Sequence, residues 1–148
     1  MNTVNQAPET ISSVHGIISK IQNKGVEAES IIDAVRRLVS DVDGTIKAWH
    51  TLNWDEVNKQ VDFLVSREDW RSLPLAAVPI AVKDVYDTSD FVTTYGSLIY
   101  EHHRPATDAK LVAMLRSLGA IVVGKTVTTE FAYWQPGPTV NPHNTNHT

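Results

Sequence analysis

Lys83 and Asp84 are the residues whose types and position first suggest chemistry in this sequence. They end an apolar run, Val78 to Val82, that is hydrophobic on both pleat faces. Such a run predicts a strand covered on both sides in a parallel sheet. Sites in open α/β sheets gather at the carboxyl ends of strands. A lysine held partly out of water there can act as a base, because burial disfavours the charged ammonium. The alternative is that Lys83 is a solvated strand-end residue that pairs with Asp84.

A second lysine, Lys125, follows a second apolar strand, Ile121 to Val123. A helix at about Asp108 to Leu118, capped by Thr107, separates the two strands. Strand, helix and strand form a βαβ unit with parallel strands. We therefore expect Lys83 and Lys125 at the same edge of the sheet, each just beyond its strand. Local physics does not choose the base between them.

The tripeptide that contains Lys125 also resembles the end of a phosphate-binding loop. It is Gly124-Lys125-Thr126, and Gly119 has the spacing of the first glycine of such a loop. The residues between them form the predicted apolar strand rather than a flexible loop before a helix. Nucleotide binding is therefore not expected.

Hydroxyl groups gather in the long segment between these strands, from Asp84 to Pro105. The segment is too apolar and β-prone for disorder, so we expect it to cross the strand ends in an ordered path. Thr93, Thr94, Tyr95 and Ser97 could donate hydrogen bonds to a substrate there, or could satisfy the segment's own backbone. Ser97 is also a candidate nucleophile, but no glycine-rich elbow surrounds it.

Histidines and tryptophans offer weaker signals. His143 and His147 are four residues apart, but Pro142 argues against a helix there, so we expect no metal site. Trp49, Trp54 and Trp70 are close together in the sequence. We interpret them as packing residues rather than an aromatic ligand cage.

From Leu73 onward the chain resembles the N-terminal part of the amidase-signature serine hydrolases. The matching segments, in order, are Pro74-Leu75, Val78 to Asp84, Thr93 to Ser97, Gly119 to Thr126, Glu130 to Ala132, and Asn141-Pro142. The resemblance implies a Ser-Ser-Lys triad in which Lys83 is the base. Departures from the family pattern are mild. Ala77 stands where a glycine is usual, and Val85 stands where an asparagine is common. Val127 occupies the position after Gly124-Lys125-Thr126, where the family often has an asparagine.

The serines of that triad are not expected in these 148 residues. The family's glycine- and serine-rich segment normally begins just after an Asn-Pro segment like Asn141-Pro142, and this sequence reaches only Thr148. We therefore expect the chain to carry only the lysine. It is then a truncated product, or one chain of a split enzyme whose partner supplies the serines.

Composition excludes several classes of function. The net charge is −4 without blocks of like charge, so nucleic acid and membrane surfaces are not expected partners. There is no cysteine to form a disulfide or a thiol nucleophile. No run approaches the roughly 20 apolar residues of a membrane span, and Met1 to Thr10 lacks the blocks of a signal peptide. We expect a cytoplasmic protein.

The N-terminal half is predicted to be mostly helical. Apolar spacing predicts helices at about Ile11–Asn23 and Glu27–Val39, an α-hairpin that packs on the core or offers a homodimer interface. A turn at Asp43-Gly44 and a strand from Ile46 to Leu52 follow. A third helix begins with Asn53 as its cap and ends near Ser66. We divide the chain into a flexible N-terminus (1–10), a helical region (11–72) and the start of the amidase core (73–148).

The expected fold is α/β, a mixed sheet with helices on both faces, of which this chain supplies the N-terminal portion. The function implied by the resemblance is hydrolysis of a small carboxamide, with neither metal nor organic cofactor. The partners implied are the amide substrate and the remainder of the amidase domain, in this chain or another.

Overall fold

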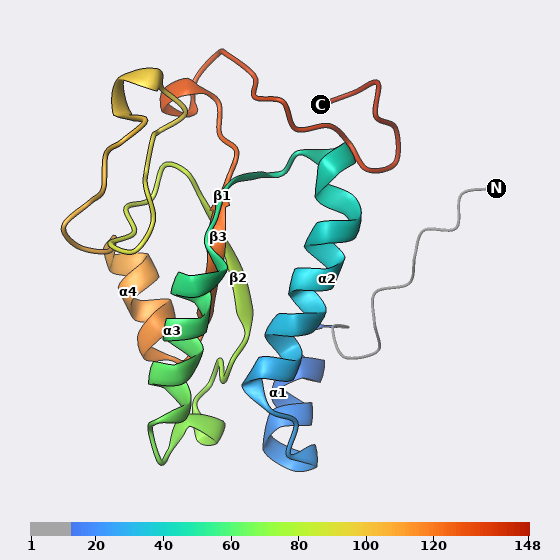
Figure 1. Ribbon diagram of the computed structural model, residues 1–148, viewed down its shortest axis with the longest axis vertical. Coiled ribbons are helices and arrows are strands. Elements are labelled where there is room, and N and C mark those ends of the chain that lie inside the picture. Colours follow the sequence, from blue (N-terminus) through green and yellow to red (C-terminus); the bar gives the residue numbers. More distant parts are fainter. Residues whose placement is uncertain (1–12) are drawn as a thin grey trace.

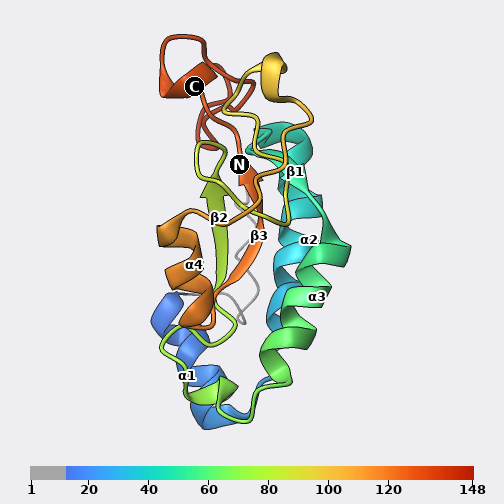
Figure 2. The same ribbon diagram turned by 90° about the vertical axis from the view of Figure 1, so that its left-hand side faces the viewer.

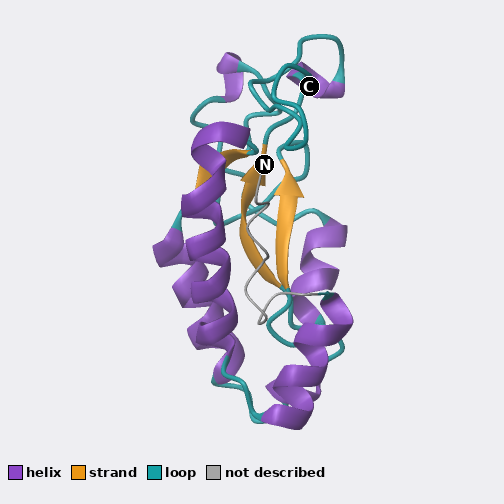
Figure 3. Cartoon of the chain, turned by 90° about the vertical axis from the view of Figure 1, so that its right-hand side faces the viewer, coloured by secondary structure: helices purple, strands orange, loops and turns teal. Residues whose placement is uncertain are grey.

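The computed structural model describes residues 13–148 and has three layers (Figures 1 and 2). A three-stranded sheet of order β1-β3-β2 lies in the middle. Helices α2 and α3 cover one face, and α1 and α4 lie on the other, as Figure 3 shows from the opposite side. This is the α/β architecture that the sequence predicts. The expected flexible segment 1–10 lies outside the described residues.

The sheet is mixed. Strand β1 (Trp49–Leu52) runs antiparallel to β3 (Ile121–Thr126), and β2 (Pro79–Lys83) runs parallel to β3. Helix α4 (Lys110–Ser117) lies between β2 and β3 in the sequence, so the predicted βαβ unit is confirmed. Three short 3-10 turns complete the fold: η1 (Trp70–Ser72), η2 (Leu98–Tyr100) and η3 (Glu130–Ala132).

Helix α1 (Val14–Lys24) begins at Ser13, whose side chain accepts from the backbone N–H of Gly16. It ends at Gly25, which has the left-handed conformation that glycine adopts without strain. The next helix begins three residues later, but α1 and α2 diverge to opposite faces of the sheet rather than lying along each other (Figures 2 and 3).

Helix α2 (Ala28–Ile46) is longer than predicted, so the turn expected at Asp43-Gly44 is wrong. The Asp43 carboxylate accepts from the backbone N–H groups of Ala48 and Trp49, at 2.7 and 3.3 Å. It therefore organises the start of β1 from inside the helix. A glycine inside a helix costs only about 1 kcal/mol, and the apolar face of α2 offsets that cost. Strand β1 is correspondingly shorter than expected.

Helix α3 (Trp54–Val65) begins as predicted, because Asn53 accepts from the N–H groups of Asp55 and Glu56. Helix α4 does not: its N-cap is Ala109, without a side-chain cap. Asp108, expected inside that helix, instead accepts from the Ser89 N–H at 2.7 Å and lies 3.0 Å from Arg116 Nε. The carboxylate thus holds the preceding segment onto α4.

One apolar core joins the helical region to the sheet. Ile21, Ile31, Val57 and Val122 are fully buried members of the same cluster. The apolar faces of α1 and α2 therefore pack within the chain; a homodimer through them stays a prediction, as does the division at residue 72. Trp70 is buried, and Trp49 and Trp54 pack against the core, as expected for packing residues. No described helix is both long and apolar enough to cross a membrane.

Candidate active site at the ends of two parallel strands

Strands β2 and β3 bring two lysines to the same end of the sheet. In their parallel register Val82 lies beside Lys125, and Lys83 lies beside Thr126. The shared edge is as predicted. The expected positions beyond the strands are wrong, because Lys83 is the last residue of β2 and Lys125 lies within β3. Each lysine is thus held by strand backbone rather than by a loop.

Lys83 is exposed, and its side chain makes no hydrogen bond or ion pair within residues 13–148. The expectation of partial burial is therefore wrong for this chain by itself. The alternative of a solvated strand-end residue is confirmed, but its pair with Asp84 is wrong. The cause is the position of β2 at an edge of the sheet. Ala81 and Lys83 occupy the same pleat face, and both are exposed, whereas Val82 and Asp84 point into the core.

Lys125 is fully buried and paired with Asp84. Its Nζ lies 3.0 Å from Asp84 Oδ1, a contact of charges whose angles are not those of a hydrogen bond. The same Nζ donates to the Tyr86 carbonyl at 2.8 Å and to Thr93 Oγ1 at 2.6 Å. Burial lowers the pKa of Lys125, and the Asp84 carboxylate opposes this. An ammonium, which has three N–H donors, fits these three oxygens.

Three of the four hydroxyl groups expected to face a substrate are engaged within the protein. Thr93 accepts from Lys125, Thr94 donates to Asp84 Oδ2 through its N–H and its hydroxyl, and Tyr95 donates to Asp87 at 2.6 Å. Phe91 and Thr88 are buried, so the segment is ordered as predicted. For Thr93, Thr94 and Tyr95, the interpretation that they satisfy the segment itself is the one that the contacts support.

Ser97 differs from these three residues. It is 4 % exposed, and its Oγ has no hydrogen-bond partner among the described residues. It lines a hollow of about 350 Å³ at the strand ends, together with Thr94, His50 and Thr128. Because no base contacts its hydroxyl, nothing in residues 13–148 activates Ser97 as a nucleophile. Its free hydroxyl can instead bond a group that enters the hollow.

The partnership of Asp84 and Lys125 was not predicted, because Asp84 was assigned to its neighbour Lys83. The alternation of side chains along β2 contained the signal. Residue 84 is two positions after Val82, so its side chain lies on the same face of the strand as that of Val82, which is beside Lys125 in the parallel register. His50 on β1 completes the surroundings, with Nδ1 3.9 Å from Asp84 Oδ2.

Gly124, the glycine of the apparent phosphate loop, is explained by packing. It lies inside β3, where a Cβ atom would stand 2.3 Å from the Thr51 carbonyl of β1. The strand that the sequence predicts in place of a phosphate loop is therefore present. Lys125, which would have to reach a phosphate, is buried against Asp84.

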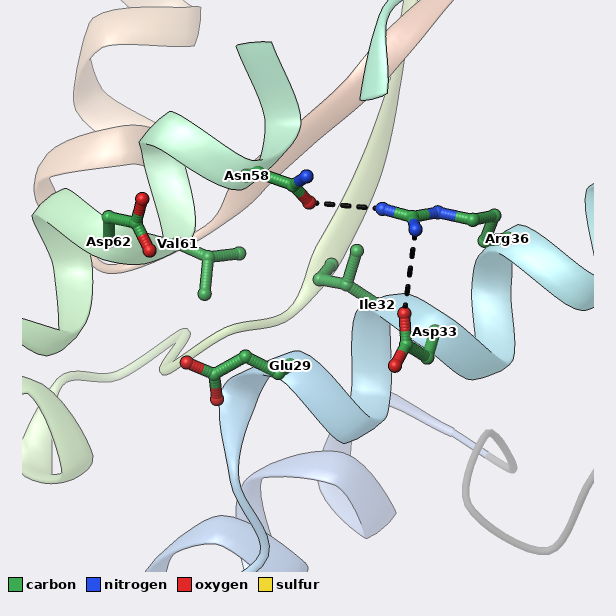
Figure 4. A pocket seen from close by; sticks show the side chains of 7 residues that line it. All are labelled: Glu29, Ile32, Asp33, Arg36, Asn58, Val61 and Asp62. Atoms are coloured by element: carbon green, nitrogen blue, oxygen red, sulfur yellow. Dashed lines mark hydrogen bonds and ion pairs between the residues drawn. The ribbon is translucent and has the colours of Figure 1, made fainter. Parts of the chain in front are cut away.

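A cavity of about 390 Å³ lies away from the lysines, between α2 and α3. Figure 4 shows Arg36 directed toward Asn58 and Asp33, above the apolar Ile32 and Val61. Arg36 donates to Asn58 Oδ1 at 3.0 Å and lies 3.8 Å from Asp33, so its guanidinium is held by residues of the groove itself. None of its lining residues comes from the strand ends. Across residues 13–148, no three His, Asp or Glu side chains form a group able to hold a metal ion.

Comparison with known proteins identifies the family. The model of the Amidase family matches residues 30–148. One subunit of the glutamyl-tRNA(Gln) amidotransferase of Halothermothrix orenii is 32 % identical over 91 % of the chain. The corresponding protein of Mycobacterium bovis is 37 % identical over 86 % of the chain. The chain spans 28 % of the length of each of these two relatives.

Solved structures agree with this result. The peptide amidase of Stenotrophomonas maltophilia superposes with a TM-score of 0.83 at 27 % identity, covering 95 % of this chain and 32 % of that one. Allophanate hydrolase of Kluyveromyces lactis gives a TM-score of 0.70 at 29 % identity, covering 82 % and 20 %. The likeness thus extends over strands, helices and the segment that crosses their ends, and the chain belongs to the amidase-signature family.

Proposed function

We propose that this chain is the N-terminal part of an amidase that cleaves a carboxamide by a Ser-Ser-Lys mechanism, with Lys83 as the base. The observation that carries the assignment is the contrast between the lysines. Lys83 ends β2 with no side-chain partner among the described residues, so its amine is free to bond a group from the rest of the domain. Lys125 instead donates two hydrogen bonds and is paired with Asp84.

In the proposed mechanism, neutral Lys83 draws a proton from the nucleophilic serine through a bridging serine. The serine attacks the amide carbonyl, and backbone N–H groups hold the oxyanion of the tetrahedral intermediate. Ammonia or an amine leaves, and water then hydrolyses the acyl-serine. Residues 1–148 contain no glycine- and serine-rich segment, so both serines come from further polypeptide. The complete enzyme is then this chain together with that segment, in a location we propose to be cytoplasmic.

The first experiment compares the complete enzyme with residues 1–148 alone on a panel of small amides, with ammonia release as the readout. We expect turnover only by the complete enzyme, and loss of that turnover in the Lys83→Ala variant. Turnover by residues 1–148 alone that disappears in Ser97→Ala would place the nucleophile in this chain and contradict the proposal.

The curated relatives favour a second candidate, because they are amidotransferase subunits. In that case the ammonia released at the same site passes to an acceptor on another polypeptide. Copurification with further subunits, together with ammonia release that rises when an acceptor is present, would support transfer over simple hydrolysis.

A further inference from the structure

The ion pair between Asp84 and Lys125 is placed where it can act on Lys83. Both side chains are fully buried, and a buried pair loses hydration that its mutual attraction does not always recover. Asp84 follows Lys83 directly, so its carboxylate is the nearest acidic group along the chain to the proposed base. In this chain the charge of that carboxylate is met by Lys125, whose Nζ lies 3.0 Å from Asp84 Oδ1.

Geometry also links the pair to the direction of Lys83. Asp84 Oδ2 accepts from the N–H and the hydroxyl of Thr94, and Oδ1 faces Lys125. Its backbone N–H bonds the Thr126 carbonyl at 3.0 Å and so continues the ladder between β2 and β3. Because side chains alternate along a strand, fixing residue 84 toward the core fixes Lys83 toward the open face.

We propose, building on the function proposed above, that Lys125 is a positioning residue for Lys83. Through Asp84 it fixes the face from which Lys83 leaves β2, and it compensates the charge of the carboxylate that follows Lys83 in the chain. Lys125 itself does not touch the substrate.

The other titratable groups around the pair come from β1 and from the segment after β2. His50 Nδ1 lies 3.9 Å from Asp84 Oδ2 and 2.9 Å from Thr51 Oγ1, and its side chain is 39 % exposed. Asp87 is bonded to Tyr95, and Asp90 is bonded to Arg116 at 2.6 and 2.7 Å. Lys125 is therefore the buried cation that contacts the carboxylate beside Lys83.

The test is the dependence of kcat/KM on pH in the complete enzyme, because the acidic limb of that profile reports the base. Lys125→Met leaves the carboxylate uncompensated, so the limb moves to higher pH, by on the order of one unit. Asp84→Asn leaves the cation uncompensated, so the limb moves to lower pH. The double variant Asp84→Asn/Lys125→Met removes both charges, so the limb returns close to its wild-type position.

Opposite shifts that cancel in the double variant are not produced by a loss of structure. If all three variants lose activity by a constant factor at every pH, and the acidic limb of the kcat/KM profile stays at its wild-type pH, the inference is overturned and the pair is structural only. If Lys125→Met fails to fold, the other two variants still test the inference. The acidic limb should move to lower pH in Asp84→Asn and should stay near its wild-type position in the double variant. Lys83→Ala separates the two proposals: retained activity there overturns the proposed function itself, whereas lost activity with unmoved limbs overturns only the role of Lys125.

Discussion

Strands β2 and β3 are built alike and exposed differently. Each follows a residue in the left-handed region, Ala77 (φ 52°) before β2 and Gly119 (φ 100°) before β3, and each carries a lysine near its carboxyl end. Strand β3 is central, and Ile121 to Lys125 are all buried; β2 is at the edge, and Ala81 and Lys83 are exposed. The order of strands in the sheet therefore decides which lysine is paired and which is free.

The largest expected effect is on the free lysine. Lys83→Ala should lower kcat/KM of the complete enzyme by at least about 10²–10⁴-fold, the usual contribution of a general base. The free energy of unfolding should change by less than about 0.5 kcal/mol, because the exposed side chain has no partner to lose among the described residues. Steady-state kinetics and urea unfolding of one preparation measure both. A large loss of stability would mean that Lys83 is a structural residue.

The paired lysine should behave in the opposite way. Lys125→Met should destabilise the complete enzyme by about 3–5 kcal/mol, because it leaves the Asp84 carboxylate buried without its cation. The double variant Asp84→Asn/Lys125→Met is the control and should recover much of that loss. Equal unfolding midpoints for Lys125→Met and the wild type would show that the pair contributes nothing to the fold.

The strand interiors offer a third contrast. Gly124 of β3 lies beside Ala81 of β2, but a Cβ at residue 124 would collide with the Thr51 carbonyl. Gly124→Ala should therefore cost about 1–3 kcal/mol through overpacking, whereas Ala81→Ser on the exposed edge should cost less than about 0.5 kcal/mol. Comparable unfolding curves for the two variants would contradict the close packing of β1 on β3.

Much of this architecture was predictable from local patterns, and the parts that were not depend on distant contacts. Two buried runs separated by a helix predicted the parallel pair, and the residues that resemble the amidase-signature family located Lys83. The exposure of Lys83 was one of two alternatives, and local patterns did not decide between them because the exposure depends on β2 being an edge strand. The extension of α2 through Gly44 was missed as well, because Asp43-Gly44 has the composition of a turn although both residues lie inside the helix.

The segment after β2 provides a test by pH. Asp87, which accepts the Tyr95 hydroxyl at 2.6 Å, raises the pKa of Tyr95 from its ordinary 10.0 to about 12. Because the pKa of Tyr95 is higher in the folded protein than in the unfolded chain, the stabilisation from the Tyr95–Asp87 bond is complete below pH 10. It is lost as the pH rises through 12. Tyr95→Phe should cost about 1.5 kcal/mol at pH 8, and the difference from wild type should shrink above pH 10. A difference that stays constant up to pH 12 would argue against this bond.

The smallest expected effect concerns the entry into β2. Ala77 is buried with φ 52°, where an L-residue is strained by about 1–2 kcal/mol. Ala77→Gly relieves that strain but loses a buried methyl worth about 0.8 kcal/mol, so stability should change by less than about 1 kcal/mol, toward stabilisation. The neighbouring Ala76→Gly, equally buried and without positive φ, should destabilise by about 1 kcal/mol. Thermal melts of Ala77→Gly and Ala76→Gly measure both changes. Equal losses of stability in the two variants would show that Ala77 is not strained.

The most direct test of Lys83 as the base is to remove its amine and put it back. The chain has no cysteine, so Lys83→Cys introduces a unique thiol into these residues, which 2-bromoethylamine converts into a lysine analogue with sulfur in the side chain. If Lys83 is the base, Lys83→Cys is folded and inactive in the complete enzyme, and alkylation with 2-bromoethylamine restores amide hydrolysis while alkylation with iodoacetamide does not. Full activity of Lys83→Cys before alkylation, or no recovery after complete alkylation of the folded enzyme, would contradict that role.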